Sequence, residues 1–133
     1  MDEDTWLERH GLHPEGPALD EVRALLSEQT GRERQSQGLG NTILMRLCCV
    51  QLFNGAALDD VLLIWRAKTA SWDASISIDV QLLCGAGLAA SKEYLAGLRT
   101  EEAEAALRRI VAAEQGGEFE DFTPAAWSAA DYM

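Results

Sequence analysis

The side chains of this sequence that could do chemistry are concentrated in one stretch, residues 64–81. Two tryptophans, two cations and two carboxylates lie there among apolar residues: Trp65, Arg66, Lys68, Trp72, Asp73 and Asp79. A third cation, Arg46, lies in the strongly apolar segment that precedes the stretch. Charged groups in apolar surroundings are costly unless they are paired, so we expect the cluster to contain matched partners.

Two interpretations of this cluster stay open. In the first, Arg46 or Arg66 forms an ion pair with Asp73 or Asp79 at a helix junction, and the pair only fixes geometry. In the second, the stretch Trp65–Gln81 lines a ligand-binding or enzymatic pocket. There the cations would meet a small anionic ligand, and the tryptophans would supply stacking area.

The two carboxylates are predicted to have different roles. Asp73 and Asp79 lie six residues apart in the sequence, which places them about 120° apart around a continuous helix. Asp73 suits the N-cap of a helix, where its carboxylate accepts from backbone N–H groups. Asp79 stands inside an apolar run and needs a cation, for which Arg46 and Arg66 are the candidates. If that pair is buried, Asp79→Ala should cost about 3–5 kcal/mol.

A glycine-containing motif offers a second chemistry. Residues 85–90 read Gly-Ala-Gly-Leu-Ala-Ala and match the GxGxxG/A pattern of dinucleotide-binding loops. That function requires a strand at residues 78–83 and a helix that joins two parallel strands of one sheet. The sequence offers no second β-branched strand after Leu95, so we interpret the glycines as a place where helices approach closely.

Metal-binding patterns are weak. His10 and His13 have i, i+3 spacing, but Gly11 and Pro14 interrupt the helix that chelation would need. The remaining candidates are three cysteines in apolar segments without the spacing of a zinc or redox motif: Cys48, Cys49 and Cys84. We therefore predict buried free thiols, no metal and no cofactor.

The composition limits which classes of partner are expected. The chain has 133 residues, and 22 acidic against 11 basic side chains give a formal net charge of −11. Binding to nucleic acid or to an anionic membrane depends on Lys and Arg, so neither is an expected partner. A basic protein suits this charge better. The sequence also lacks the motifs of triad, zincin and P-loop enzymes, which makes an enzyme the less favoured prediction.

Hydrophobic periodicity is helical along nearly the whole chain. We predict one all-α domain over residues 1–133, with six or seven short helices packed as antiparallel hairpins around an apolar central helix at residues 42–53. A polar, glycine-rich loop is expected at residues 31–41. The other helices are expected at residues 5–10, 17–30, 59–71, 73–95 with a break near the glycines, 100–115, and from residue 123 onward.

Function and location remain expectations. The favoured function is a non-catalytic protein-binding or regulatory module, such as an immunity-like inhibitor of a cationic protein. With no signal peptide and no apolar run of membrane-spanning length, we expect a soluble, cytoplasmic protein, and its alanine- and arginine-rich texture suggests a bacterial one. Residues 50–58 resemble residues 80–88, and whether this marks a helical-hairpin repeat stays open.

Overall fold

The computed structural model describes residues 1–127, and none of these residues lies in a β-strand, which confirms the all-α prediction. No helix in this part is both long and apolar enough to cross a membrane. The α-helices are α1 (Glu3–His10), α2 (Pro17–Gln35), α3 (Thr42–Gly55), α4 (Val61–Lys68), α5 (Trp72–Ser77), α6 (Leu88–Leu98) and α7 (Glu101–Gln115). Two short 3-10 helices, η1 (Leu58–Asp60) and η2 (Val80–Cys84), lie between them.

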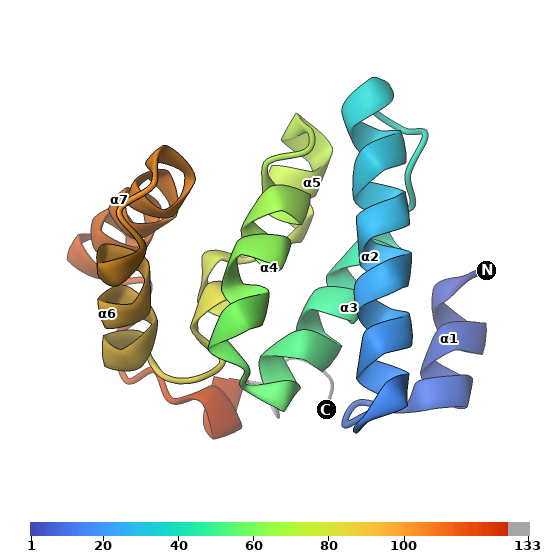
Figure 1. Ribbon diagram of the computed structural model, residues 1–133, viewed down its shortest axis with the longest axis horizontal. Helices are drawn as coiled ribbons and strands as arrows, with labels where there is room; N and C mark the ends of the chain where they lie inside the picture. The colour runs from blue at the N-terminus through green and yellow to red at the C-terminus, as the bar shows by residue number, and fades with distance from the viewer. Residues whose placement is uncertain (128–133) are drawn as a thin grey trace.

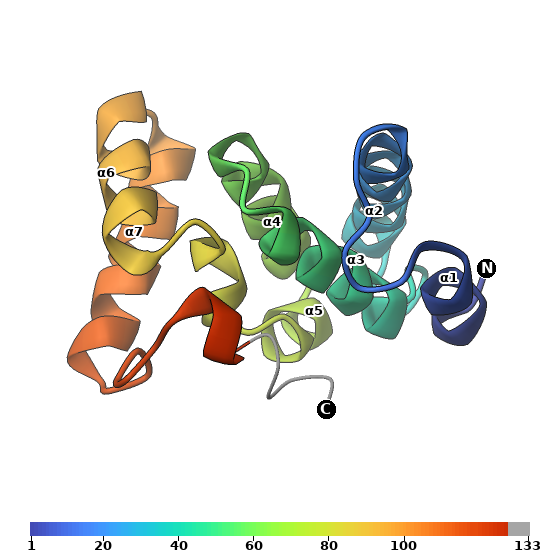
Figure 2. The same cartoon turned by 90° about the horizontal axis from the view of Figure 1, so that it is seen from below.

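The helices follow one another across the molecule. Figure 1 shows the α6–α7 pair at one end, α4 with α5 in the middle, α2 with α3 beyond them, and α1 at the other end. Seen from below, α2, α4 and α6 form one row, and α1, α3 and α5 form a second row beside it (Figure 2). Each row can therefore cover the apolar side of the other.

Helix α3 is the centre of the fold. It packs against α1, α2, α4, α5 and η2, so nearly all of its sides are covered. This is possible because its sequence is apolar nearly all round, as the central-helix prediction required. Its buried side chains are Leu44, Met45, Leu47, Cys48, Cys49, Val50, Gln51, Leu52 and Phe53.

The helix starts are set by side-chain caps. Thr100 accepts from the backbone N–H of Ala103 (3.1 Å) and begins α7 where the sequence predicts. Helix α1 begins earlier than the predicted Thr5, because the Asp2 carboxylate accepts from the Thr5 N–H (2.8 Å) and is a strong N-cap. A last helical turn covers residues 124–127, and the continuation of this predicted helix lies outside the described residues.

The predicted loop at residues 31–41 is wrong for residues 31–35, because α2 continues to Gln35. One glycine in a helix costs only about 1 kcal/mol, and the packing of the last turn outweighs that cost. Glu33 extends the buried side of α2 one turn beyond Leu26 and Gln29. The polar connection that remains is residues 36–41, which we call the α2–α3 loop.

The glycine motif lies in helical surroundings, where η2 and α6 replace the strand and helix of a dinucleotide-binding unit. A Cβ atom at Gly85 would overlap the backbone of Phe53 on α3, which confirms the predicted close approach at this glycine. Glycine is required at position 87 for a different reason, since the φ of Gly87, 104°, lies in a region that favours glycine.

The two similar segments meet at this contact. Residues 50–58 end at the first residue of η1, and residues 80–88 end at the first residue of α6. A helical-hairpin repeat predicts that the two segments end at corresponding places in the fold. The repeat itself stays a prediction.

Both ends of the described chain are fixed on α3. The indole N–H of Trp6 donates to Oε1 of Gln51 (2.8 Å), and Nε2 of Gln51 donates to the carbonyl oxygen of Gly11 (2.8 Å). At the other end, the rings of Phe53 and Trp127 meet edge to face with 5.4 Å between centroids. The core therefore extends from α1 to the residues after α7.

Candidate functional site

The predicted site residues do not converge on one pocket. Lys68 lies buried at the end of α4, and its Nζ donates to the carbonyl oxygens of Ser75 (2.6 Å) and Ile78 (2.5 Å). These carbonyls lie at the C-terminal end of α5, where unpaired C=O groups favour a cation. Burial, and next the charge of Arg109, lower the pKa of Lys68. Lys68 therefore fixes α5 against α4.

Arg46 pairs with Asp79, one of the partners the sequence predicts. Their Nη2 and Oδ2 atoms lie 3.3 Å apart, and the two side chains are 25% and 43% exposed. The pair is therefore half-exposed, and the condition under which Asp79→Ala should cost about 3–5 kcal/mol is not met. Asp79 lies in extended backbone between α5 and η2, at the surface, rather than inside an apolar helix.

Arg66 pairs with a residue that the sequence did not indicate. Its guanidinium binds the Glu102 carboxylate at the start of α7 through two hydrogen bonds of 2.9 and 2.7 Å. This interaction holds the pKa of Glu102 below its ordinary value. Nη2 of Arg34 on α2 donates to the backbone carbonyl oxygen of Arg66 (3.3 Å), and the charge of Arg34 also lowers the pKa of Glu102.

These charged groups border a hollow of about 280 Å³ between α2 and α4, which we call the α2–α4 hollow. The buried hydroxyl of Thr30, one of its lining residues, has no hydrogen-bond partner among the described residues. The lining is a mixture of hydroxyls, cations and one carboxylate: Ser27, Thr30, Gly31, Arg34, Leu63, Arg66 and Glu102. Its chemistry suits a small polar ligand.

The two tryptophans of the cluster are in different surroundings. Trp65 packs partly buried against the core, whereas Trp72 is 71% exposed at the first position of α5. Asp73 is exposed and is not the N-cap that the sequence predicts. Ser71 is the N-cap, and its hydroxyl accepts from the N–H of Ala74 (3.1 Å). A serine is as good a cap as an aspartate, and it comes two residues earlier.

A buried carboxylate that the sequence did not single out organises this corner of the molecule. Glu33 is only 1% exposed, and its Oε1 accepts from the N–H groups of Gly38 (3.0 Å) and Gly40 (3.1 Å). Its Oε2 accepts from the Ser71 hydroxyl (2.5 Å). Burial raises the pKa of Glu33, but these hydrogen bonds outweigh burial, so the pKa lies below its ordinary value.

Two glutamines complete the corner. Oε1 of Gln29 accepts from the N–H of Asn41 (2.8 Å), and Oε1 of Gln37 accepts from the N–H of Asp73 (3.2 Å). The α2–α3 loop is therefore bound to both α2 and α5. Continuing the α2 periodicity through Gly31 would have placed Gln29 and Glu33 on the buried side, and this signal was available in the sequence.

The same corner carries a group of exposed apolar side chains. Its members are large apolar residues of the α2–α3 loop, the first turn of α3, and α5, each more than half exposed: Leu39 (57%), Ile43 (59%), Trp72 (71%) and Ile76 (60%). Helix α5 packs against α3, and the loop is joined to α5 by the Gln37–Asp73 hydrogen bond. We call these four residues the corner patch.

A second buried carboxylate lies at the contact of α2 with α4. Asp60 is 5% exposed and binds Arg23 through two hydrogen bonds of 2.8 and 2.9 Å. These bonds raise the pKa of Arg23 above its ordinary value. Arg23 also pairs with exposed Asp20 (2.8 Å). The sequence placed Asp60 only in the first turn of a helix and gave no signal of its partner.

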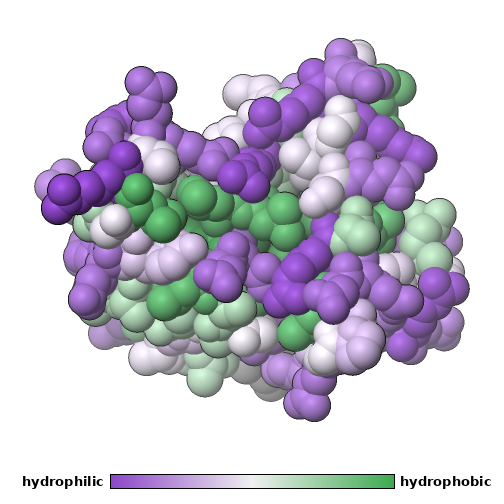
Figure 3. All heavy atoms as spheres, in the orientation of Figure 1, coloured by the Kyte–Doolittle hydropathy of each residue, from purple (hydrophilic) through white to green (hydrophobic). Residues whose placement is uncertain are grey.

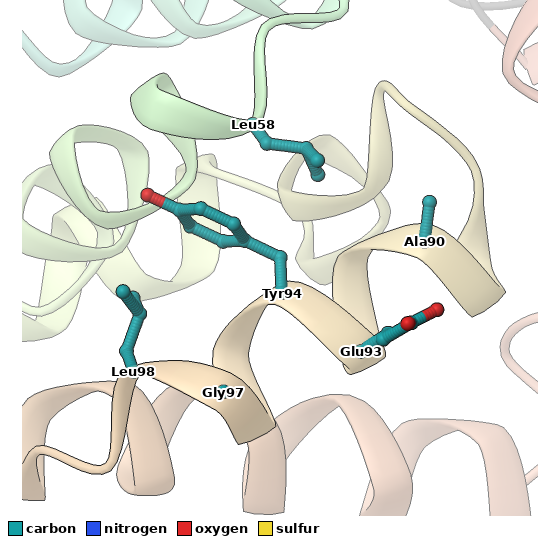
Figure 4. A pocket seen from close by; sticks show the side chains of 6 residues that line it. All are labelled: Leu58, Ala90, Glu93, Tyr94, Gly97 and Leu98. Atoms are coloured by element: carbon teal, nitrogen blue, oxygen red, sulfur yellow. The ribbon is translucent and has the colours of Figure 1, made fainter.

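Apolar residues also gather on the face that carries α2, α4 and α6. Figure 3 shows them across the middle of this face, over α4, in a hollowed region between α2 on one side and α6 and α7 on the other. Between α6 and η1, the short helix that leads into α4, is a pocket of about 530 Å³, which we call the α4–α6 pocket (Figure 4). Its lining residues are Leu58, Ala90, Glu93, Tyr94, Gly97 and Leu98.

The remaining reactive groups are arranged for structure. Burial raises the pKa of the Cys48 and Cys84 thiols to about 12, so neither is an activated nucleophile. His10 packs on the Trp6 ring with 4.2 Å between centroids. No group of three or more His, Cys, Asp or Glu side chains among residues 1–127 could hold a metal ion.

Comparison with known proteins adds no functional assignment to this geometry. Searches of protein-family models, curated sequences and solved structures find no match to the chain.

Proposed function

We propose that the protein is a non-catalytic binding module that docks a basic protein partner through the corner patch. The observation that carries the proposal is the exposure of four large apolar side chains in one corner. Such patches mark interaction sites on monomeric proteins, and tryptophan is enriched among residues that dominate binding energy. Trp72, the most exposed of the four, is the expected anchor.

Charge favours a basic partner over a second copy of the chain. Two copies, each with a formal net charge of −11, repel one another, whereas a cationic protein is attracted. Asp73, next to Trp72, is exposed and forms no ion pair with another residue in the described part of the chain. An immunity-like inhibitor that neutralises a cationic protein is the specific form of this proposal.

The corner also suits docking because its backbone is held before a partner arrives. Glu33 and Gln29 bind the α2–α3 loop, and Ser71 joins the start of α5 to the same carboxylate. A surface that is already ordered loses less conformational entropy on binding. The hydrogen bonds of the corner therefore support affinity without contacting the partner.

The test is capture of a partner from an extract of the source cells by three proteins. These are the unaltered chain, a double variant that combines Trp72→Ser with Ile76→Ser, and a control variant, Ala96→Ser, at an exposed position of α6. We expect a basic protein that the unaltered chain and the control retain, that added salt releases, and that the double variant does not retain. Equal capture by the double variant would contradict the proposal. So would a dimer, seen by sedimentation, that the double variant abolishes.

A small anionic ligand in the α2–α4 hollow is the second candidate. It is favoured by two cations of the lining, Arg34 and Arg66, of which only Arg66 forms a hydrogen-bonded ion pair with a carboxylate among the described residues. A thermal-shift screen with inorganic phosphate and small carboxylates tests it, since a ligand at 100 times its dissociation constant adds about 2.7 kcal/mol of stability. The shift should disappear in Arg34→Gln, and no shift with any anion would exclude this candidate.

A further inference from the structure

The α4–α6 pocket has an apolar interior. Leu58 of η1 and Leu98 of α6 lie on opposite sides of the Tyr94 ring, and the ring forms a wall between them (Figure 4). Gly97 has no side chain, and a Cβ atom there would meet no other atom within 4 Å, so the space beside the ring stays open. A volume of about 530 Å³ is in the range of small-molecule sites.

The charged groups at this pocket are acidic. Glu93 lines it and forms no ion pair with any other described residue, and its carboxylate points toward the Ala90 side (Figure 4). At the other end, the Tyr94 hydroxyl donates to Oδ1 of Asp59 at a long 3.4 Å. No Lys or Arg belongs to the lining. The chain's net charge of −11 adds to the negative potential of this surface.

The aromatic wall also favours a cation. Burial, and next the charge of Asp59, raise the pKa of Tyr94, so the phenol stays neutral at physiological pH. A neutral aromatic ring presents a negative face, which attracts an ammonium group. An anion would meet the Glu93 carboxylate without any compensating cation in the lining, and a neutral apolar molecule would leave that carboxylate unpaired.

We infer that the α4–α6 pocket binds a small organic amine, whose apolar part packs on Leu58 and the Tyr94 ring and whose ammonium group pairs with Glu93. This site lies apart from the corner patch and involves none of its residues. The inference therefore stands independently of the proposed function, and the failure of one does not affect the other.

The experiment is a titration of isotope-labelled protein followed by amide chemical shifts. Benzylammonium is the probe, and benzyl alcohol and benzoate are ligands of the same shape with no charge and with the opposite charge. We expect saturable shifts with benzylammonium at residues 58–59 and 93–98, and affinity at least about fivefold weaker for the two other molecules.

Two variants assign the charge. Glu93→Gln should weaken benzylammonium at least about fivefold, whereas Glu104→Gln, an exposed carboxylate on α7, should leave the affinity unchanged. Tyr94→Leu should weaken all three molecules. Equal affinity for the three molecules, unchanged binding in Glu93→Gln, or absence of saturable shifts with benzylammonium would each overturn the inference.

Discussion

Two buried carboxylates at opposite ends of α2 are stabilised in different ways. Where α2 meets α4, Asp60 is neutralised by a cation, Arg23, that holds both of its oxygens. At the other end of α2, Glu33 has no cation among residues 1–127 within hydrogen-bond distance, and its partners are two backbone N–H groups and one hydroxyl. The first arrangement joins two helices, and the second orders a loop.

The difference connects stability to the proposed function. An ion pair between helices contributes to stability without shaping a surface, whereas Glu33 sets the backbone of the α2–α3 loop and the start of α5. Those segments carry Leu39 and Trp72 of the corner patch. We therefore expect changes at Arg23 to affect stability alone and changes at Glu33 to affect both stability and docking.

The largest loss of stability is expected when the Arg23–Asp60 ion pair is removed. Arg23→Met keeps the apolar stem but leaves the Asp60 carboxylate buried without a cation, and should cost about 3–5 kcal/mol of unfolding free energy. Asp20→Asn, which removes the exposed partner of the same arginine, should cost less than about 1 kcal/mol. Chemical denaturation followed by circular dichroism measures both. Equal losses in the two variants would contradict the assignment of Asp60 as the partner that matters.

A smaller loss of stability is expected when the Glu33 carboxylate is removed. Glu33→Ala leaves the N–H groups of Gly38 and Gly40 without their acceptor, and should cost about 1–3 kcal/mol. Hydrogen exchange should speed up at these two amides and at Ala74 in α5, while α6 amides stay protected. If the loop amides exchange at the same rate in the variant, Glu33 does not order the loop.

The contribution of Glu33 to stability should depend on pH. The Glu33 pKa in the folded protein lies below its ordinary value of 4.5, so its stabilising contribution is complete above pH 4.5 and is lost as the pH falls through the lower, folded-state value. The stability difference between the unaltered protein and Glu33→Gln should therefore shrink on acidification below pH 4.5. Denaturation curves from neutral to acidic pH test this, and a difference that grows on acidification would have the wrong sign.

The smallest effect concerns the half-exposed pair. Asp79→Ala should cost less than about 1 kcal/mol, since water screens the Arg46–Asp79 interaction. Denaturation of this variant beside Arg23→Met compares a surface pair with a buried one. A loss of about 3 kcal/mol or more in Asp79→Ala would be as large as for a buried pair. It would show that burial does not account for a difference between the two ion pairs.

Local signals in the sequence were sufficient for most of the helices. The apolar circumference of residues 42–53 and the cap at Thr100 predicted α3 and α7 because those features act within a few residues. The same reasoning ended α2 too early at Gly31, because the packing of Glu33 against a loop and Ser71 is a tertiary effect. It misplaced the α5 cap because Ser71 and Asp73, two residues apart, differ little in their propensity to cap a helix.

The site was less predictable than the fold. The apolar surroundings indicated Arg46 and Arg66 as candidate partners for Asp79, but burial of the pair depended on where the backbone leaves α5. Glu102 lies 36 residues after Arg66 in the sequence, and no short-range pattern joins them. Likewise, the sequence marked Trp72 as a chemical candidate but could not show that it is exposed, because exposure depends on which elements pack around α5 in the fold.

The proposal that the corner patch is a docking surface depends on Trp72. The affinity of the captured basic partner should be measured for the unaltered chain and for Trp72→Ser by titration calorimetry, on proteins whose unfolding free energies agree within about 0.5 kcal/mol. We expect binding at least about tenfold weaker for Trp72→Ser, as for an interface anchor. Affinities that agree within about twofold would contradict it.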